Sequence, residues 1–246
     1  TITGEGVDGK GAITDHSIYT ALWQFQLGRV QVKGDATIGG TCRIDLRKAS
    51  NSTFEGRAWL KGGSNDTLRV KNHVEETTNC GLNFNNTDVE IGKIVLEEGG
   101  MMGYEVDTVL NVPGGVEMKA GSRIHYWNAA KTKAAIVVTG EGAGLKASSA
   151  DANTQDKPVT IRNGASLDLR GEKALSFKDW FLNEGALTVS GGTHKFLDAA
   201  VTNNGSIAVS AGEIDLGGGV DRLHVGIPGN VPGVICVFDG LHHIYH

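Results

Sequence analysis

The chain has 246 residues, of which 39% are hydrophobic and 21% charged, and its formal net charge is −5. This composition is ordinary for a folded protein and lacks a basic stripe, which argues against nucleic acid as a partner. No apolar run approaches the roughly 20 residues that span a bilayer, so the sequence predicts no transmembrane segment. The 36 glycines and only 4 prolines predict many tight turns between extended segments and disfavour helical bundles.

Residues 1–28 are expected to form an N-terminal cap. Asp15, Ile18, Leu22 and Phe25 fit a short amphipathic helix with an Asp N-cap, and they fit a strand nearly as well. Either element would cover the open edge of the strands that follow.

Between residues 30 and 126, short segments alternate apolar and polar residues, which is typical of strands with one buried face. These segments include Val30-Gln31-Val32, Ile44-Asp45-Leu46, Leu68-Arg69-Val70, Val116-Glu117-Met118 and Ile124-His125-Tyr126. Their irregular spacing indicates repeats interrupted by insertions. The stretch 146–157 is polar and has no apolar periodicity, so it is predicted to be a loop that leaves the stack of strands.

Towards its C-terminus the sequence repeats at an interval of 20 residues. Four columns recur: Ile161, Phe181, Val201; Asn163, Asn183, Asn203; Leu167, Leu187, Ile207; and Leu169, Val189, Val209. Each repeat reads as a strand, an Asn/Gly turn, a second strand and a connector. A unit this small cannot bury its own apolar face, so it must stack on its neighbours at about 4.8 Å per rung. Residues 220–246 are expected to form the last rungs or a C-terminal cap, with the apolar run 234–238 as a buried final strand.

These patterns predict an all-β protein with one domain over residues 1–246. The domain is expected to be a right-handed parallel β-helix, a solenoid with irregular rungs and capped ends. Asn163, Asn183 and Asn203 are interpreted as a structural ladder whose amides hydrogen-bond along the solenoid axis.

The candidate ligand-binding residues are Tyr126 and Trp127. Neighbouring residues of a strand point to opposite faces, so one of the two is expected to point outwards. Exposed aromatic rings can stack on sugar rings, and this pair is therefore a candidate glycan platform.

Several motifs that suggest chemistry are interpreted as structural. The glycines of Gly4-x-Gly6-x-x-Gly9 match a dinucleotide fingerprint, but the strand that should precede them has no room. Asn86-Thr87-Asp88 matches the first motif of polygalacturonase-like glycosidases without that family's other motifs, and it is predicted to be a turn. A lyase would need charge-neutralising cations, which Lys93, Arg123 and Lys131 could supply if they faced one side.

Metal sites and disulfides are not predicted either. The half-matches to calcium-binding nonapeptides at 4–8 and 216–223 are isolated, and such sites need tandem copies. His242, His243 and His246 lie at the very end of the chain, and Cys42, Cys80 and Cys236 are widely spaced. No catalytic residue, metal ion or cofactor is therefore assigned.

The repeats N-E-G-A-L-T-V-S-G-G at 183–192 and N-N-G-S-I-A-V-S-A-G at 203–212 resemble those of autotransporter passenger domains and related bacterial surface proteins, whose solenoids are pectin-lyase-like. The opening segments at 4–13 and 27–40 are similar to stretches of such proteins. The membrane β-barrel of a complete autotransporter has no counterpart in these residues.

This resemblance implies export from a bacterium to the cell surface or the extracellular space. It also implies a non-enzymatic structural or adhesive module, with surface glycans or surface proteins of host or bacterial cells as partners. The alternative is a carbohydrate-binding or polysaccharide-degrading β-helix, because some β-helices are polysaccharide lyases or hydrolases. That alternative rests on an analogy of fold.

Overall fold

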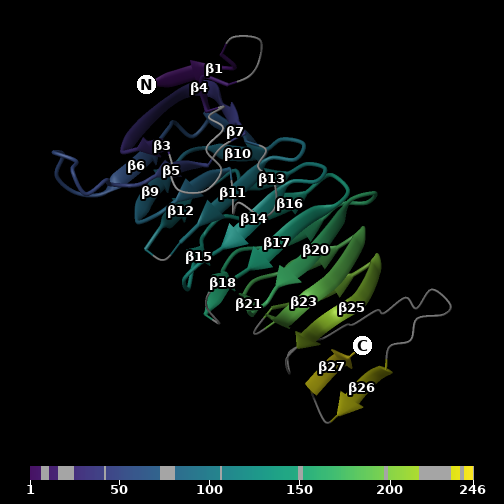
Figure 1. The fold of residues 1–246 in the computed structure, drawn as a ribbon. Coiled ribbons are helices and arrows are strands. Elements are labelled where there is room, and N and C mark those ends of the chain that lie inside the picture. The colour runs from purple at the N-terminus through teal and green to yellow at the C-terminus, as the bar shows by residue number, and fades with distance from the viewer. Residues whose placement is uncertain are drawn as a thin grey trace.

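The computed structural model describes residues 1–6, 11–15, 25–41, 43–72, 81–105, 107–148, 152–196, 199–215, 234–238 and 241–245. Within these ranges every regular element is a β-strand, and parallel strands stack as a solenoid of about 8 turns (Figure 1). The predicted all-β class and the parallel solenoid are therefore confirmed.

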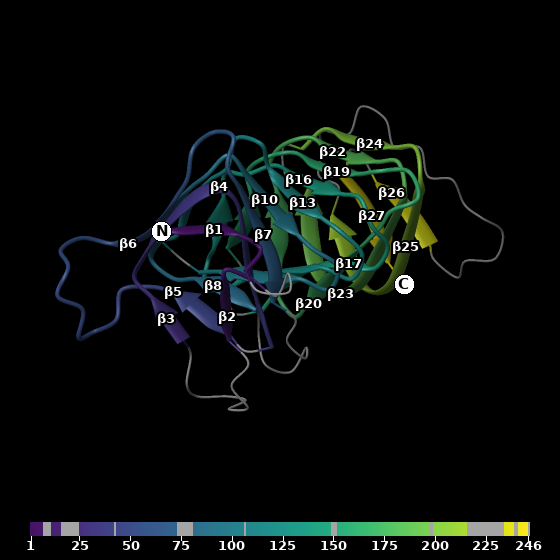
Figure 2. The same cartoon turned by 90° about the horizontal axis from the view of Figure 1, so that it is seen from above.

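Each turn supplies one strand to each of three faces of the solenoid. Figure 2 shows β16, β19 and β22 on one side of the solenoid and β17, β20 and β23 on another. Face 1 stacks the second half of β4 (Arg29–Gly40) and then β7 (Thr67–Asn72), β10 (Lys93–Leu96), β13 (Val116–Met118), β16 (Ile136–Val138), β19 (Val159–Ile161), β22 (Phe181–Asn183) and β24 (Val201–Asn203).

Face 2 stacks β3 (Phe25–Leu27), β5 (Ile44–Leu46), β8 (Leu82–Phe84), β11 (Met101–Tyr104), β14 (Arg123–Tyr126), β17 (Ala143–Ala147), β20 (Ser166–Gly171), the first part of β23 (Ala186–Phe196) and β25 (Ser206–Asp215). Face 3 consists of two ladders. The first joins the start of β4 to β6 (Ala58–Lys61), β9 (Thr87–Glu90) and β12 (Val109–Asn111), and the second joins β15 (Lys131–Thr132), β18 (Asn153–Gln155), β21 (Leu175–Phe177) and the end of β23.

The two ends of the solenoid differ in how their strands pair: the N-terminal strands pair in parallel and the C-terminal strands pair antiparallel. β1 (Ile2–Gly4) and β2 (Ile13–Asp15) pair in parallel with β4, so the described part of the predicted N-terminal cap is strand. The remaining residues of the segment expected to be a helix or strand, 16–24, lie outside the described residues. At the other end, β26 (Val234–Phe238) and β27 (Leu241–Tyr245) pair antiparallel with each other, and β27 pairs antiparallel with β25. The parallel stacking of rungs therefore gives way to an antiparallel hairpin.

The turns differ in length, as the irregular spacing predicted. On face 1, Ala36 pairs with Leu68, a separation of 32 residues, whereas Val116 pairs with Ile136 at a separation of 20 residues. Apart from β1 with β4 and β23 with β25, the paired strands show no register shift, so the extra residues lie mainly in the corners between faces.

The prediction that residues 146–157 form a loop is wrong where the structure has strands. β17 extends to Ala147, and β18 pairs with both β15 and β21 while its three residues are buried. Apolar periodicity fails here because the inward-facing residues are amides. The Asn153 Oδ1 accepts a hydrogen bond from the Ala130 amide at 3.0 Å, and the Gln155 Nε2 donates to the Ala134 carbonyl at 2.9 Å.

The core is a set of columns in which each inward side chain contacts the equivalent one in the next turn. On face 1 the column contains Ile38, Val70, Leu96, Met118, Val138 and Ile161, all with 0% exposure. Each such residue contributes about 1.5–3 kcal/mol of hydrophobic free energy. Glycines permit close stacking at some corners: a Cβ on Gly205 would lie 1.9 Å from the Gly185 carbonyl oxygen.

Candidate functional site

The asparagine column forms a ladder of two residues. The Asn183 Nδ2 donates to the Asn203 Oδ1 at 2.6 Å, and both side chains are buried. On the other side of Asn183, however, the partner in the adjacent turn is Ile161. Asn163 is exposed in a turn and lies outside the ladder, contrary to the prediction.

Turn length explains this difference. Leu167 and Leu187 are partners on face 2, as the 20-residue repeat predicts. The corner before Leu187 is two residues shorter than the corner before Leu167, so Asn183 moves into the strand position that Ile161 holds in the preceding turn. The Asn183 Oδ1 then accepts a hydrogen bond from the Gly185 amide at 3.1 Å, which closes the shorter corner.

The candidate pair Tyr126 and Trp127 is divided between the core and the surface. Tyr126 has 0% exposure, and its hydroxyl donates to the Gln155 Oε1 at 2.8 Å. Burial raises the pKa of this hydroxyl above its usual value. The Tyr126 ring therefore cannot stack on a ligand, and this half of the prediction is wrong. Trp127 is partly exposed and packs edge-on against His125, with ring centroids 5.7 Å apart.

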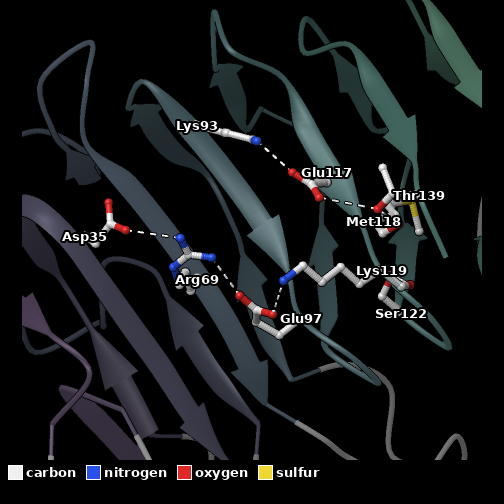
Figure 3. Close-up of polar contacts among 9 residues, drawn as sticks. All are labelled: Asp35, Arg69, Lys93, Glu97, Glu117, Met118, Lys119, Ser122 and Thr139. Carbon is white, nitrogen blue, oxygen red and sulfur yellow. Dashed lines mark hydrogen bonds and ion pairs between the residues drawn. The ribbon is translucent and has the colours of Figure 1, made fainter. Parts of the chain in front are cut away.

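A charge ladder runs along the outside of face 1 (Figure 3). Arg69 bridges two turns, with its Nη2 3.1 Å from the Asp35 carboxylate and its Nη1 2.8 Å from Glu97. Lys119 continues the row, with its Nζ 2.7 Å from the second oxygen of Glu97. Sequence reasoning missed this ladder because its members lie 22 to 34 residues apart.

A second, shorter row lies beside the first. The Lys93 Nζ lies 2.6 Å from Glu117, and the Thr139 hydroxyl donates to the other oxygen of Glu117 at 3.4 Å (Figure 3). The hydrogen bond from Lys93 holds the pKa of Glu117 below its usual value. Partial burial raises the pKa of Glu97, but the hydrogen bonds from Lys119 and Arg69 outweigh it and the pKa is lowered. Both carboxylates are therefore held ionised by partners that stack along the axis.

Face 2 carries a polar network over its first turns. The Arg43 Nε lies 2.6 Å from the buried Asp45 carboxylate, and Glu105 accepts hydrogen bonds from Asn83 at 3.1 Å and from Asn85 at 3.0 Å. Arg43 lies between two carboxylates, because its Nη2 is also 3.6 Å from Glu105.

Further along face 2, two guanidinium groups meet over a glycine. A Cβ on Gly144 would lie 3.0 Å from the Arg123 Nη1 and 3.1 Å from the Arg170 Nε. The Arg170 Nε also lies 3.1 Å from Asp168. The three cations that sequence reasoning grouped do not converge in this way, because Lys93 is on face 1, Arg123 on face 2 and Lys131 on face 3.

Face 3 carries an outward row of charged, aromatic and apolar residues across four successive strands. Arg29, Trp59, Asp88 and Val109 are successive partners on β4, β6, β9 and β12. Trp59 is partly exposed, and Val109 is 40% exposed. Sequence reasoning missed the row because the long spacings between its members hide their alignment.

The glycosidase-like triplet was predicted to be a turn, but only Asn86 lies at the corner, because Thr87 and Asp88 belong to β9. Asn86 has a φ of 47° at the corner, and the Thr87 hydroxyl donates to the Leu46 carbonyl at 2.6 Å. Asp88 pairs with Arg57, with an Nε to Oδ1 distance of 3.2 Å.

Within the described ranges, no group of three or more His, Cys, Asp or Glu side chains could hold a metal ion. The side chains of His242, His243 and Cys236 lie outside the described residues, as do His246, Cys42, Cys80 and the nonapeptide-like segment 216–223. The parts of the chain that the structure describes contain no helix with the length and hydropathy to cross a bilayer.

Comparisons of the chain with protein-family models, with curated proteins and with solved structures found no match.

Proposed function

We propose that this chain is a non-enzymatic structural and adhesive module of an exported bacterial surface protein, similar to an autotransporter passenger segment. The main support is the solenoid of about 8 turns, whose outer charges pair from turn to turn along the axis. Eight rungs at about 4.8 Å give a stack roughly 40 Å long. Such a stack holds its outer faces at fixed spacing over its whole length.

The pairing of charges supports a scaffold role more than a catalytic one. Catalytic carboxylates are usually placed so that their pKa values are driven apart, whereas Glu97 and Glu117 both have lowered pKa values. Neighbouring turns on face 1 are also linked by these ion pairs, in addition to their backbone hydrogen bonds. The location outside the cell rests on the resemblance of the repeats at 183–192 and 203–212.

The test is binding of the purified, labelled chain to bacterial and host cells, together with an assay for degradation of neutral and acidic polysaccharides. The proposal expects saturable binding to at least one cell surface and no turnover. Release of oligosaccharide products, or a lack of binding to every surface, would contradict it.

The second candidate is a carbohydrate-binding or polysaccharide-degrading β-helix. Partly exposed Trp59 and Trp127 on outer faces favour its binding form. The meeting of Arg123 and Arg170 over Gly144 favours recognition of acidic chains, and a lyase would in addition need a base beside these cations. The same degradation assay decides between this candidate and the first.

A further inference from the structure

One corner of the solenoid is much longer than its counterparts. The corner from face 2 to face 3 contains residues 47–57 in the first turn, between β5 and β6, whereas between β8 and β9 it contains only Asn85 and Asn86. Both ribbon views show the 47–57 loop projecting from the body of the solenoid (Figures 1 and 2). Insertions of this kind in repeat proteins often mark the face that binds a partner.

The loop is attached to face 3. The Phe54 ring packs so closely on Gly28 that a Cβ there would lie 2.6 Å from the ring. The Arg29 guanidinium lies 4.4 Å from the centroid of the same ring and donates to the Glu55 carbonyl. Arg57, at the end of the loop, pairs with Asp88 of β9 at 3.2 Å. The loop therefore forms an anchored wall beside the outward row of face 3.

Trp59 lies at the centre of that row. Its backbone partners in the neighbouring turns are Arg29, whose guanidinium lies over the Phe54 ring, and Asp88, which pairs with Arg57. The Lys61 Nζ lies 5.9 Å from the centroid of the indole ring, and Glu90 pairs with Lys61 at 3.8 Å. A partly exposed aromatic ring thus has hydrogen-bond donors and acceptors of both charges in its neighbourhood.

This chemistry matches a sugar better than other occupants. A sugar ring has apolar C–H faces that stack on an aromatic ring, and its hydroxyl groups both donate and accept hydrogen bonds. A peptide that adds as a β-strand needs an open strand edge, but β6 and β9 are already paired on both edges. The carboxylates of this face are each paired with a cation, Asp88 with Arg57 and Glu90 with Lys61, and this pairing disfavours a strongly anionic chain.

We infer that the face-3 platform, formed by Arg29, Trp59, Lys61 and Asp88 beside the 47–57 loop, binds an uncharged glycan. This inference rests on the adhesive part of the proposed function and names its ligand class. Trp59 supplies the stacking surface, the charged neighbours bind hydroxyl groups, and the loop limits the ligand on one side.

The experiment is a titration of the whole chain against neutral and acidic glycans on an array, repeated with Trp59→Ala and Trp59→Phe. Wild type should bind a neutral glycan, Trp59→Ala should weaken that binding at least about tenfold, and Trp59→Phe should retain most of it because the ring is kept. Gly28→Ala, which displaces Phe54 and the loop, should also weaken binding. Trp180→Ala is the matched control, since Trp180 is 52% exposed and lies at the corner between β21 and β22.

Equal binding by wild type and Trp59→Ala would overturn the site, even if the chain adheres to cells. Binding of acidic glycans alone would overturn the ligand class. Adhesion to cells that a protease abolishes and a glycosidase leaves intact would overturn the inference but not the adhesive role. Circular dichroism and the urea midpoint of each variant separate a lost site from a lost fold.

Discussion

Replacing Asn183 with alanine tests whether turn length, rather than sequence periodicity, sets the register of the solenoid. The Asn183 side chain is 1% exposed and makes three hydrogen bonds: to the Asn203 Oδ1 at 2.6 Å, to the Ser206 carbonyl at 2.9 Å and from the Gly185 amide at 3.1 Å. Alanine removes all three and leaves their partners in a place that water reaches poorly. At about 1 kcal/mol for each bond, the loss is about 3 kcal/mol.

The matched control is Asn163→Ala. The two asparagines occupy the same column of the sequence repeat, but Asn163 is exposed in a turn. Its replacement should change the free energy of unfolding by no more than about 0.5 kcal/mol. Periodicity alone would instead predict equal effects for the two substitutions.

The assay is equilibrium unfolding in urea followed by circular dichroism. With an m-value of about 3 kcal/mol/M, Asn183→Ala should lower the midpoint by roughly 1 M. Because repeat proteins can open locally, hydrogen exchange at the Gly185 amide gives a second readout and should become faster in Asn183→Ala alone. Equal midpoints for the two variants would refute the register and the ladder together.

Three further predictions concern the corners, the charge ladder and the core. Ala129 has a φ of 63°, so Ala129→Gly should stabilise the protein by about 0.5 kcal/mol. Ala130→Gly, at a site with 0% exposure, should destabilise it. Thermal melts in which both variants shift the melting temperature in the same direction would contradict this. The lowered pKa of Glu97 stabilises the fold above its usual value of 4.5, and this contribution is lost as the pH falls through the folded-state pKa. Glu97→Gln should therefore lower the urea midpoint more at pH 7 than at pH 3, and an equal deficit at both values would disprove the linkage. Tyr126→Phe leaves the Gln155 Oε1 without its hydroxyl donor and should cost about 1–3 kcal/mol without changing glycan binding, which a melt and the array measure together.

The sequence alone determined the fold class. Alternation such as Leu167-Asp168-Leu169 gives a strand one apolar side, and the 20-residue recurrence of such strands requires that each unit bury that side against the next. The face-2 partners Leu167, Leu187 and Ile207 lie in register as their spacing predicts. The same reasoning failed to predict β18, because its inward residues are polar. The side chains of Asn153 and Gln155 form hydrogen bonds with backbone groups of the preceding turn.

Only the tertiary structure decided which residues meet across turns. A corner shortened by two residues moves Asn183 beside Ile161 and leaves Asn163 at the surface. Period-two alternation puts Tyr126 on the same side as Ile124 and Trp127 on the other, but only the tertiary structure shows that the Tyr126 hydroxyl bonds to Gln155 inside the core.

The outer rows follow the same rule. Arg29, Trp59 and Asp88 are about 30 residues apart in the chain and adjacent on face 3. Local sequence sets the direction of each side chain within its strand, because the strand repeat is two residues. The number of residues in each corner sets which residues of successive turns become partners. The corners can be delimited only once the stacked strands are known.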